Sequence, residues 1–76
     1  MKPEIKTGTY KEEGWLARVE ILEDNSDSEW DRFKLKVLGT IMPSPIFKTP
    51  EDGTIFEVDA MKKYKHYIGW SLIINA

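Results

Sequence analysis

The chain has 76 residues, with 11 Lys and Arg against 13 Asp and Glu, one His and no Cys. A chain of this size has room for one hydrophobic core, so we expect a single domain over residues 1–76. The absence of Cys excludes disulfides and Cys-based zinc sites, and the balance of 41% hydrophobic and 32% charged residues is typical of a folded globular protein.

Nothing in the sequence indicates a membrane protein. No apolar run approaches the roughly 20 residues that span a bilayer. The first ten residues, MKPEIKTGTY, lack the apolar segment of a signal peptide. We therefore expect a soluble cytoplasmic protein that has no membrane partner.

The first half of the chain predicts three strands. Residues 5–10 are expected to form an edge strand. In residues 15–22 the apolar residues Trp15, Ala17, Val19 and Ile21 share one face. The clearest alternation covers residues 31–38, which put Phe33, Leu35 and Val37 on one face and Arg32, Lys34 and Lys36 on the other. This period of two is typical of an antiparallel strand with one solvated face.

The second half predicts a loop, a strand, a helical turn and a last strand. Pro43 and Pro45 lack a backbone N–H and should end the preceding strand. A turn at residues 50–53 leads into a strand at 54–58. Residues 60–65 are expected to form a short helical turn capped by Asp59, with a strand as the alternative. The last strand, residues 67–74, has one apolar side made of Ile68, Trp70, Leu72 and Ile74.

Short strands with one apolar face bury those faces only if the sheet curls. We therefore predict a mainly β fold, a small antiparallel β-barrel of about five strands with one helical turn near residues 60–65. The layout resembles SH3-like barrels in its long hairpin, its Pro-rich loop and the late Gly69-Trp70. The sequence lacks the acidic ALYDY-type segment of that family, so no peptide-binding residues are carried over. An OB-like barrel is the alternative.

Catalytic and metal-binding patterns are weak. His66 is the only His, and none of the four Ser residues lies in a nucleophile-elbow sequence. We expect no enzyme and no cofactor, with a ligand site around His66 as a distant third hypothesis. Residues 23–31 contain five acids but fit no EF-hand pattern, which favours a solvated hairpin loop over a weak divalent-cation site.

Basic and aromatic residues form a candidate binding face for single-stranded nucleic acid. Trp30 has the same parity as Arg32, Lys34 and Lys36, so all four should point outward together. A second interleaved group contains Lys62, Lys63, Tyr64 and Tyr67. The alternative is a solvated face neutralised by cross-strand acids such as Glu20 or Glu57, which the pI near 5.3 favours.

Apolar residues at unexpected positions point to a protein partner. Leu16, Leu22, Leu38, Ile55 and Ile73 lie opposite the predicted core faces, unless a bulge shifts the phase or a second layer covers them. Ile46 and Phe47 should lie near them or cap a barrel end. Contiguous exposed apolar residues usually mark a partner surface, so the candidate interaction residues are Leu38, Ile46, Phe47, Ile55 and Ile73. A non-catalytic protein-interaction module or small homo-oligomer is the leading expectation, and a nucleic-acid-binding barrel is the alternative.

Overall fold

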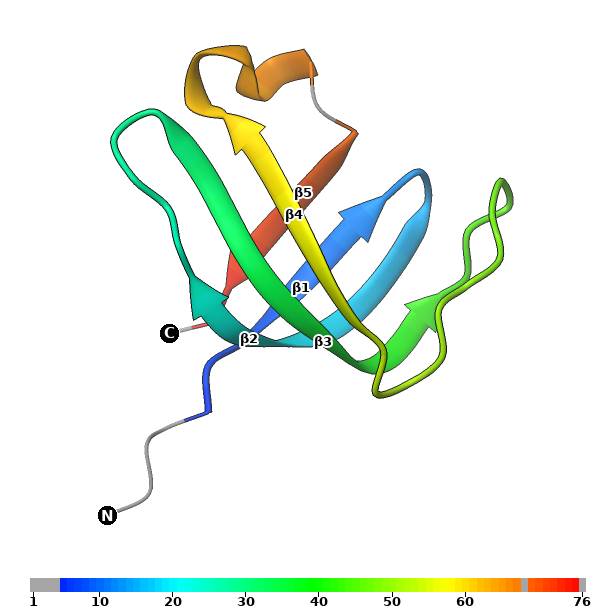
Figure 1. The fold of residues 1–76 in the computed structure, drawn as a ribbon. Helices are drawn as coiled ribbons and strands as arrows, with labels where there is room; N and C mark the ends of the chain where they lie inside the picture. The colour runs from blue at the N-terminus through cyan, green and yellow to red at the C-terminus, as the bar shows by residue number, and fades with distance from the viewer. Residues whose placement is uncertain (1–4, 68, 76) are drawn as a thin grey trace.

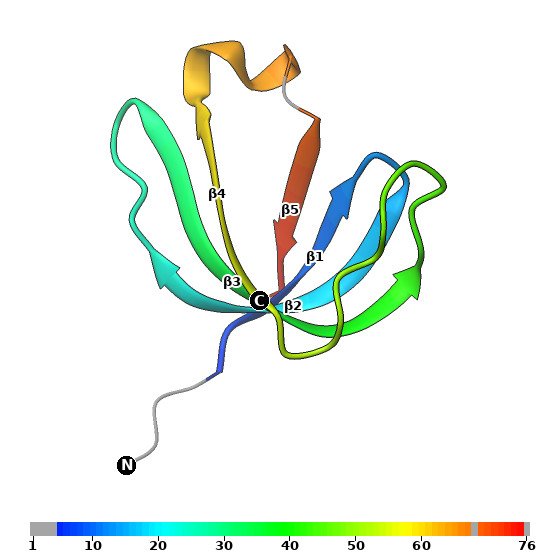
Figure 2. The same ribbon diagram turned by 45° about the vertical axis from the view of Figure 1, so that its right-hand side comes forward.

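The computed structural model describes residues 5–67 and 69–75. It contains five strands and one 3-10 turn: β1 (Thr7–Glu12), β2 (Trp15–Asp24), β3 (Trp30–Met42), β4 (Ile55–Met61), η1 (Lys62–Tyr67) and β5 (Trp70–Ile74). All neighbouring strands are antiparallel, in the order β4-β3-β2-β1-β5. The sheet curls into a half-barrel, which confirms the predicted mainly β, five-stranded fold (Figures 1 and 2).

The first strand was predicted at residues 5–10 and at an edge, and both details are wrong. β1 spans Thr7–Glu12 and lies inside the sheet, between β2 and β5. It is interior because β5 returns from the end of the chain to pair with it, for example Tyr10 with Leu72. Such a long-range pairing leaves no local signal in the sequence.

The helical turn begins later than predicted. Ala60 and Met61 belong to β4, where they pair with Asp31 and Trp30. Asp59 pairs with Arg32 in the same ladder and therefore caps no helix. Since β3 already begins at Trp30, it supplies a strand partner as far as Met61, and η1 starts only beyond that point. Because η1 extends to Tyr67, β5 begins at Trp70 and not at residue 67. Ile68 lies outside the described residues.

The predicted core faces of β2 and β3 are confirmed. Trp15, Ala17, Val19 and Ile21 are buried, and so are Leu35 and Val37 on the facing strand. Tyr10 joins them from β1 and is fully buried. The concave side of the half-barrel therefore holds the core, and the alternate residues of these strands form the convex side, here called the outer face.

The pairing of β2 with β3 contains three register shifts, and two of them explain part of the unexpected parity. The pairing of β2 with β3 shifts register between Arg18 and Val19, where Leu38 is the extra residue on β3. Beyond this bulge Thr40 points inward, and its Oγ1 accepts a hydrogen bond of 3.1 Å from the indole nitrogen of Trp15. A second shift makes Leu22 the extra residue on β2. A bulge increases the local twist of a sheet, which helps this short sheet to curl.

Aromatic side chains fill the half-barrel. The Tyr10 ring lies 5.5 Å from Trp15, 5.2 Å from Phe56 and 6.0 Å from Trp70, measured between ring centroids. Phe33 meets Trp70 edge-on at 6.4 Å. Edge-to-face aromatic pairs add stabilisation beyond the area that they bury. Burial of the Tyr10 phenol, together with its hydrogen bond to the Glu12 carboxylate, raises the pKa of Tyr10 well above its ordinary value.

Trp70 also links the two ends of the sheet. Its indole Nε1 donates a 3.2 Å hydrogen bond to the backbone carbonyl of Asp59 in β4. β4 and β5 are the two ends of the strand order, and no backbone ladder joins them in the described part of the chain. The side of the half-barrel between β4 and β5 is therefore bridged by side chains.

The long loop between β3 and β4 is fastened to the turn between β1 and β2. The Ser44 hydroxyl donates to the Glu13 carbonyl at 2.8 Å and accepts from the backbone N–H of Ile46 at 3.0 Å. The Phe47 ring packs edge-on against Trp15 at 6.0 Å. Gly14 adopts a positive φ of 85°, which suits this tight turn. In Figure 1 the loop lies beside this turn.

Candidate functional site

The basic row of β3 lies on the outer face. Arg32, Lys34 and Lys36 alternate with the inward-facing Phe33, Leu35 and Val37, as the sequence predicted. Trp30 begins the same row, and the guanidinium carbon of Arg32 lies 4.9 Å from the centroid of its ring. This distance is a cation–π contact, so Trp30 already has one cationic partner within the chain.

Acidic residues stand opposite each cation of this row. Asp59 is paired with Arg32 and Glu57 with Lys34 on the β4 side, while Glu20 is paired with Lys36 on the β2 side. The ammonium nitrogen of Lys34 also lies 3.3 Å from a carboxylate oxygen of Glu23. The row is therefore a mixed-charge surface, in keeping with the neutralised face that the sequence analysis considered as the alternative.

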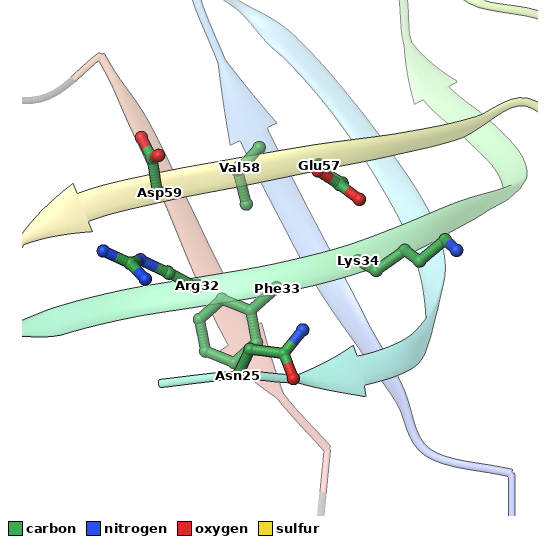
Figure 3. A pocket seen from close by; sticks show the side chains of 7 residues that line it. All are labelled: Asn25, Arg32, Phe33, Lys34, Glu57, Val58 and Asp59. Carbon is green, nitrogen blue, oxygen red and sulfur yellow. The ribbon is translucent and has the colours of Figure 1, made fainter. Parts of the chain in front are cut away.

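An open hollow of about 320 Å³ follows this mixed-charge surface. It is lined by Asn25, Arg32, Phe33, Lys34, Glu57, Val58 and Asp59 (Figure 3). Figure 3 shows the two cations on β3 and the two carboxylates on β4 along neighbouring strands. The hollow thus carries two cations and two carboxylates, whereas proteins that bind a phosphate backbone contact it mainly through Lys and Arg.

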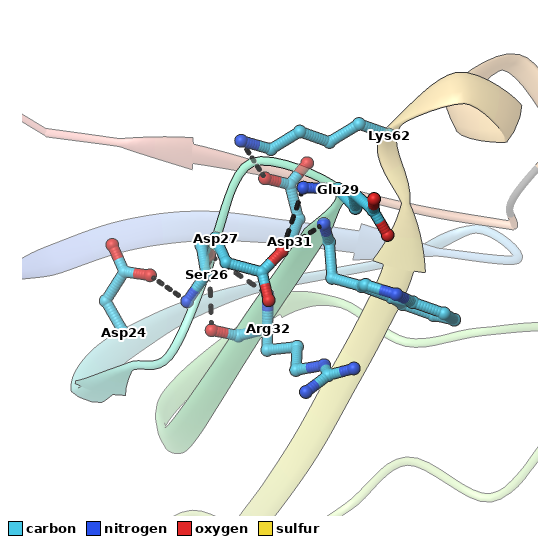
Figure 4. Close-up of polar contacts among 8 residues, drawn as sticks. Asp24, Ser26, Asp27, Glu29, Asp31, Arg32 and Lys62 are labelled. Atoms are coloured by element: carbon cyan, nitrogen blue, oxygen red, sulfur yellow. Dashed lines mark hydrogen bonds and ion pairs between the residues drawn. The ribbon is translucent and has the colours of Figure 1, made fainter.

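The acidic loop between β2 and β3 uses its carboxylates internally. Asp27 Oδ1 accepts hydrogen bonds of 2.8 Å from the backbone N–H groups of Glu29 and Trp30 (Figure 4). Asp24 Oδ1 accepts one of 3.0 Å from the N–H of Ser26, and the Ser26 hydroxyl accepts one of 3.0 Å from the N–H of Arg32. The loop is thus an ordered hairpin connection built from Asx turns.

These hydrogen bonds lower the pKa of both carboxyl groups. The pKa of Asp24 is lowered by its hydrogen bonds with Ser26, and that of Asp27 by the backbone N–H groups of Glu29 and Trp30. In the described part of the chain, no three His, Asp or Glu side chains gather closely enough to hold a metal ion.

The structure brings the two predicted basic-aromatic groups to one end of the half-barrel. Met61, which precedes η1, is the strand partner of Trp30, and the N–H of Lys62 donates to the Glu29 carbonyl at 2.8 Å. Lys63 Nζ lies 5.2 Å from the centroid of the exposed Tyr64 ring. Acids enter this group too, since Lys62 Nζ lies 3.9 Å from Asp31 (Figure 4).

The side chains of Tyr67 and His66 lie outside the described residues. The place of Tyr67 in the candidate binding face, and the ligand site around His66, therefore stay predictions from the sequence.

The candidate apolar residues fall into three groups. Leu38 and Ile55 lie on the outer face of neighbouring strands and are 40% and 54% exposed, and Ile46 is an exposed residue of the loop between them. Ile73 is exposed on β5, away from the other candidates in the strand order. Phe47 is partly buried against the core and caps the barrel end, the second of the two placements expected for it.

Sequence reasoning missed two exposed residues beside this group. Ile41 and Met42 end β3 and are both 57% exposed. The signal that could have found them is the pair of consecutive apolar residues directly before Pro43. Leu38, Ile41, Met42, Ile46 and Ile55 all belong to the segment of the chain from the bulge of β3 to the start of β4, and together they are here called the aliphatic surface.

Comparisons add no relative to this picture: no known protein family, curated protein or solved structure matches the chain. Within the described residues, no helix has the length and apolar character to cross a bilayer.

Proposed function

We propose that this chain is a non-catalytic protein-interaction module that acts in the cytoplasm and binds an apolar patch of another protein through the aliphatic surface. The observation that carries the proposal is the concentration of exposed aliphatic side chains between Leu38 and Ile55. Contiguous exposed apolar patches often mark partner surfaces, and we propose that these side chains form such a patch.

The scaffold suits such a role. The loop that carries Ile46 is anchored to the rest of the domain by Ser44 and Phe47. An anchored loop loses less conformational entropy on binding, so its exposed side chains contribute more of their contact energy to affinity. The return of β5 to β1, with η1 directly before β5, supports the SH3-like layout over the OB-like one as part of this proposal.

Site-specific photo-crosslinking in living cells tests the proposal. A photo-crosslinking amino acid is placed at Ile55 in one variant and at Lys11, an exposed residue of β1, in the matched control. We expect a discrete adduct with another protein from position 55 and none from position 11, and loss of that adduct on Leu38→Lys. Equal adducts from both positions, or none from position 55, would contradict the proposal.

A second candidate function is supported by one specific observation. The pairing of Met61 with Trp30 places the aromatic rings of Trp30 and Tyr64 and the cations Lys62 and Lys63 at one end of the half-barrel. Tyr64 is exposed and Trp30 is half-buried, and aromatic rings beside cations are a common means of holding single-stranded nucleic acid. Titration with a single-stranded oligonucleotide at low salt should then quench Trp fluorescence, and Trp30→Leu should abolish the change. Unchanged fluorescence at low salt would eliminate this candidate.

A further inference from the structure

The free edge of β5 has a defined set of backbone hydrogen-bonding groups. The N–H of Asn75 donates to the Thr7 carbonyl at 2.9 Å, so Asn75 faces β1. Backbone groups alternate sides along an antiparallel strand, so Ser71 and Ile73 also face β1. Trp70, Leu72 and Ile74 therefore direct their N–H and C=O groups away from β1. In the described part of the chain, no strand pairs with that side of β5.

β5 also lacks the features that normally prevent edge-to-edge pairing. Its sequence, WSLII, contains no charged residue and no Pro, and its pairing with β1 has no register shift. Ile73 is 69% exposed on the outer face, and Ile74 is 47% exposed. Natural edge strands are usually protected by charges, Pro or bulges.

The other end of the sheet is protected. Alternation along β4 turns the backbone groups of Glu57 and Asp59 away from β3, and both side chains are exposed carboxylates. The outward carbonyl of Asp59 is already occupied by the indole of Trp70. Two copies of β4 paired about Glu57 would bring like charges together, which is destabilising.

We propose that β5 pairs antiparallel with β5 of a second copy of this chain. A two-fold axis at Leu72 places this residue opposite Leu72 of the partner subunit, and it places Ile73 beside the partner subunit's Ser71. The outward N–H and C=O groups of each strand then find partners in the other, and no charged side chain enters the pairing. The contact uses one edge per chain, so it closes at a dimer.

This dimer goes beyond the proposed function, because Ile73 and the aliphatic surface lie on different strands. Each dimer carries two copies of the aliphatic surface. Two linked binding surfaces raise the apparent affinity for a partner that is itself multivalent.

Sedimentation equilibrium of the full chain, from low micromolar to near millimolar concentration, tests the pairing. We expect the average mass to rise from 8.9 kDa toward twice that value. Ile73→Lys should raise the dissociation constant by about tenfold or more, since it places a charge at the pairing. Ile74→Pro removes an outward N–H without touching the ladder with β1, and it should have the same effect.

Leu38→Lys is the matched control, with the same charge placed on the aliphatic surface and away from β5. It should leave dimer formation unchanged while it abolishes the adduct formed from position 55, so the two proposals fail separately. A wild-type chain that stays monomeric at every concentration would overturn the pairing, as would Ile73→Lys dimerising like wild type. If a variant melts at a lower temperature than the wild type, amide hydrogen exchange of the wild type tests the pairing instead. The N–H groups of Leu72 and Ile74 must then gain protection from exchange as the protein concentration rises.

Discussion

At Gly8 the structure leaves no room for a side chain. A Cβ atom placed there would lie 2.7 Å from the backbone carbonyl oxygen of Ile73, in the neighbouring strand β5. We predict that Gly8→Ala destabilises the protein by about 1–3 kcal/mol, because the clash involves backbone and not the end of a flexible side chain. The measurement is the free energy of unfolding from urea denaturation.

Gly39 provides the matched control for this prediction. A Cβ atom at Gly39 meets nothing within 4 Å, and its φ is not positive. Gly39→Ala should therefore be neutral or slightly stabilising. If both variants lost the same stability, the close approach of β1 and β5 at Gly8 would be wrong.

At the scale of elements, the loop between β2 and β3 makes stability depend on pH. The folded-state pKa values of Asp24 and Asp27 lie below the ordinary value of 3.8, so folding favours the charged forms. Their stabilisation is complete above that value and is lost as the pH falls through the lower folded-state pKa. We predict that the melting temperature of the wild type falls on acidification below about pH 4.

Asp27→Asn should weaken this acid dependence, because the amide oxygen still accepts hydrogen bonds but does not titrate. Glu51→Gln, which removes an exposed carboxylate in the other long loop, should leave the wild-type curve unchanged. Thermal unfolding followed by circular dichroism, from about pH 2 to about pH 7, measures the melting temperature of both variants across the range in which carboxyl groups titrate. An Asp27→Asn curve as steep as the wild type would contradict the loop geometry.

The sequence predicted those elements whose pattern is local. β2 and β3 each have one buried and one solvated face, so alternation alone assigned Val19 and Leu35 to the core and Lys34 to the outer face correctly. The interior position of β1 and the continuation of β4 to Met61 depend on strands distant in the chain, and no local pattern encodes them.

The same limit applied to the candidate site. Parity found the row from Trp30 to Lys36, but the register of the ladders decided which acids stand opposite. The sequence analysis considered a bulge as one reason for the parity of Leu38 but did not locate it, because Leu38, Gly39 and Thr40 carry no turn signal apart from the single Gly. The sequence thus predicted which basic and aromatic residues lie on the outer face of β3, and the pairing with β2 and β4 showed which acidic residues lie beside them.

At the scale of the whole molecule, Trp70 holds the two ends of the sheet together. It stacks on Tyr10 with an interplanar angle of 22° and donates to the Asp59 carbonyl of β4. We predict that Trp70→Ala costs about 3–5 kcal/mol of folding stability. Trp70→Phe keeps the ring contacts but loses the hydrogen bond, so it should cost about 0.5–1.5 kcal/mol. Urea denaturation measures both, and a Trp70→Ala variant as stable as Trp70→Phe would refute the bridging role.

In the described part of the chain, β5 ends the sheet without a strand on its free side, and the Trp70 side chain bridges it to β4. Amide hydrogen exchange of the dilute monomer, resolved by residue with NMR, tests it most directly. We expect slow exchange at Ile73, whose N–H faces β1, and fast exchange at Leu72 and Ile74, whose N–H groups face outward. Uniformly slow exchange along β5 in the monomer would mean that β4 and β5 close the barrel by a backbone ladder, and β5 would then have no free edge.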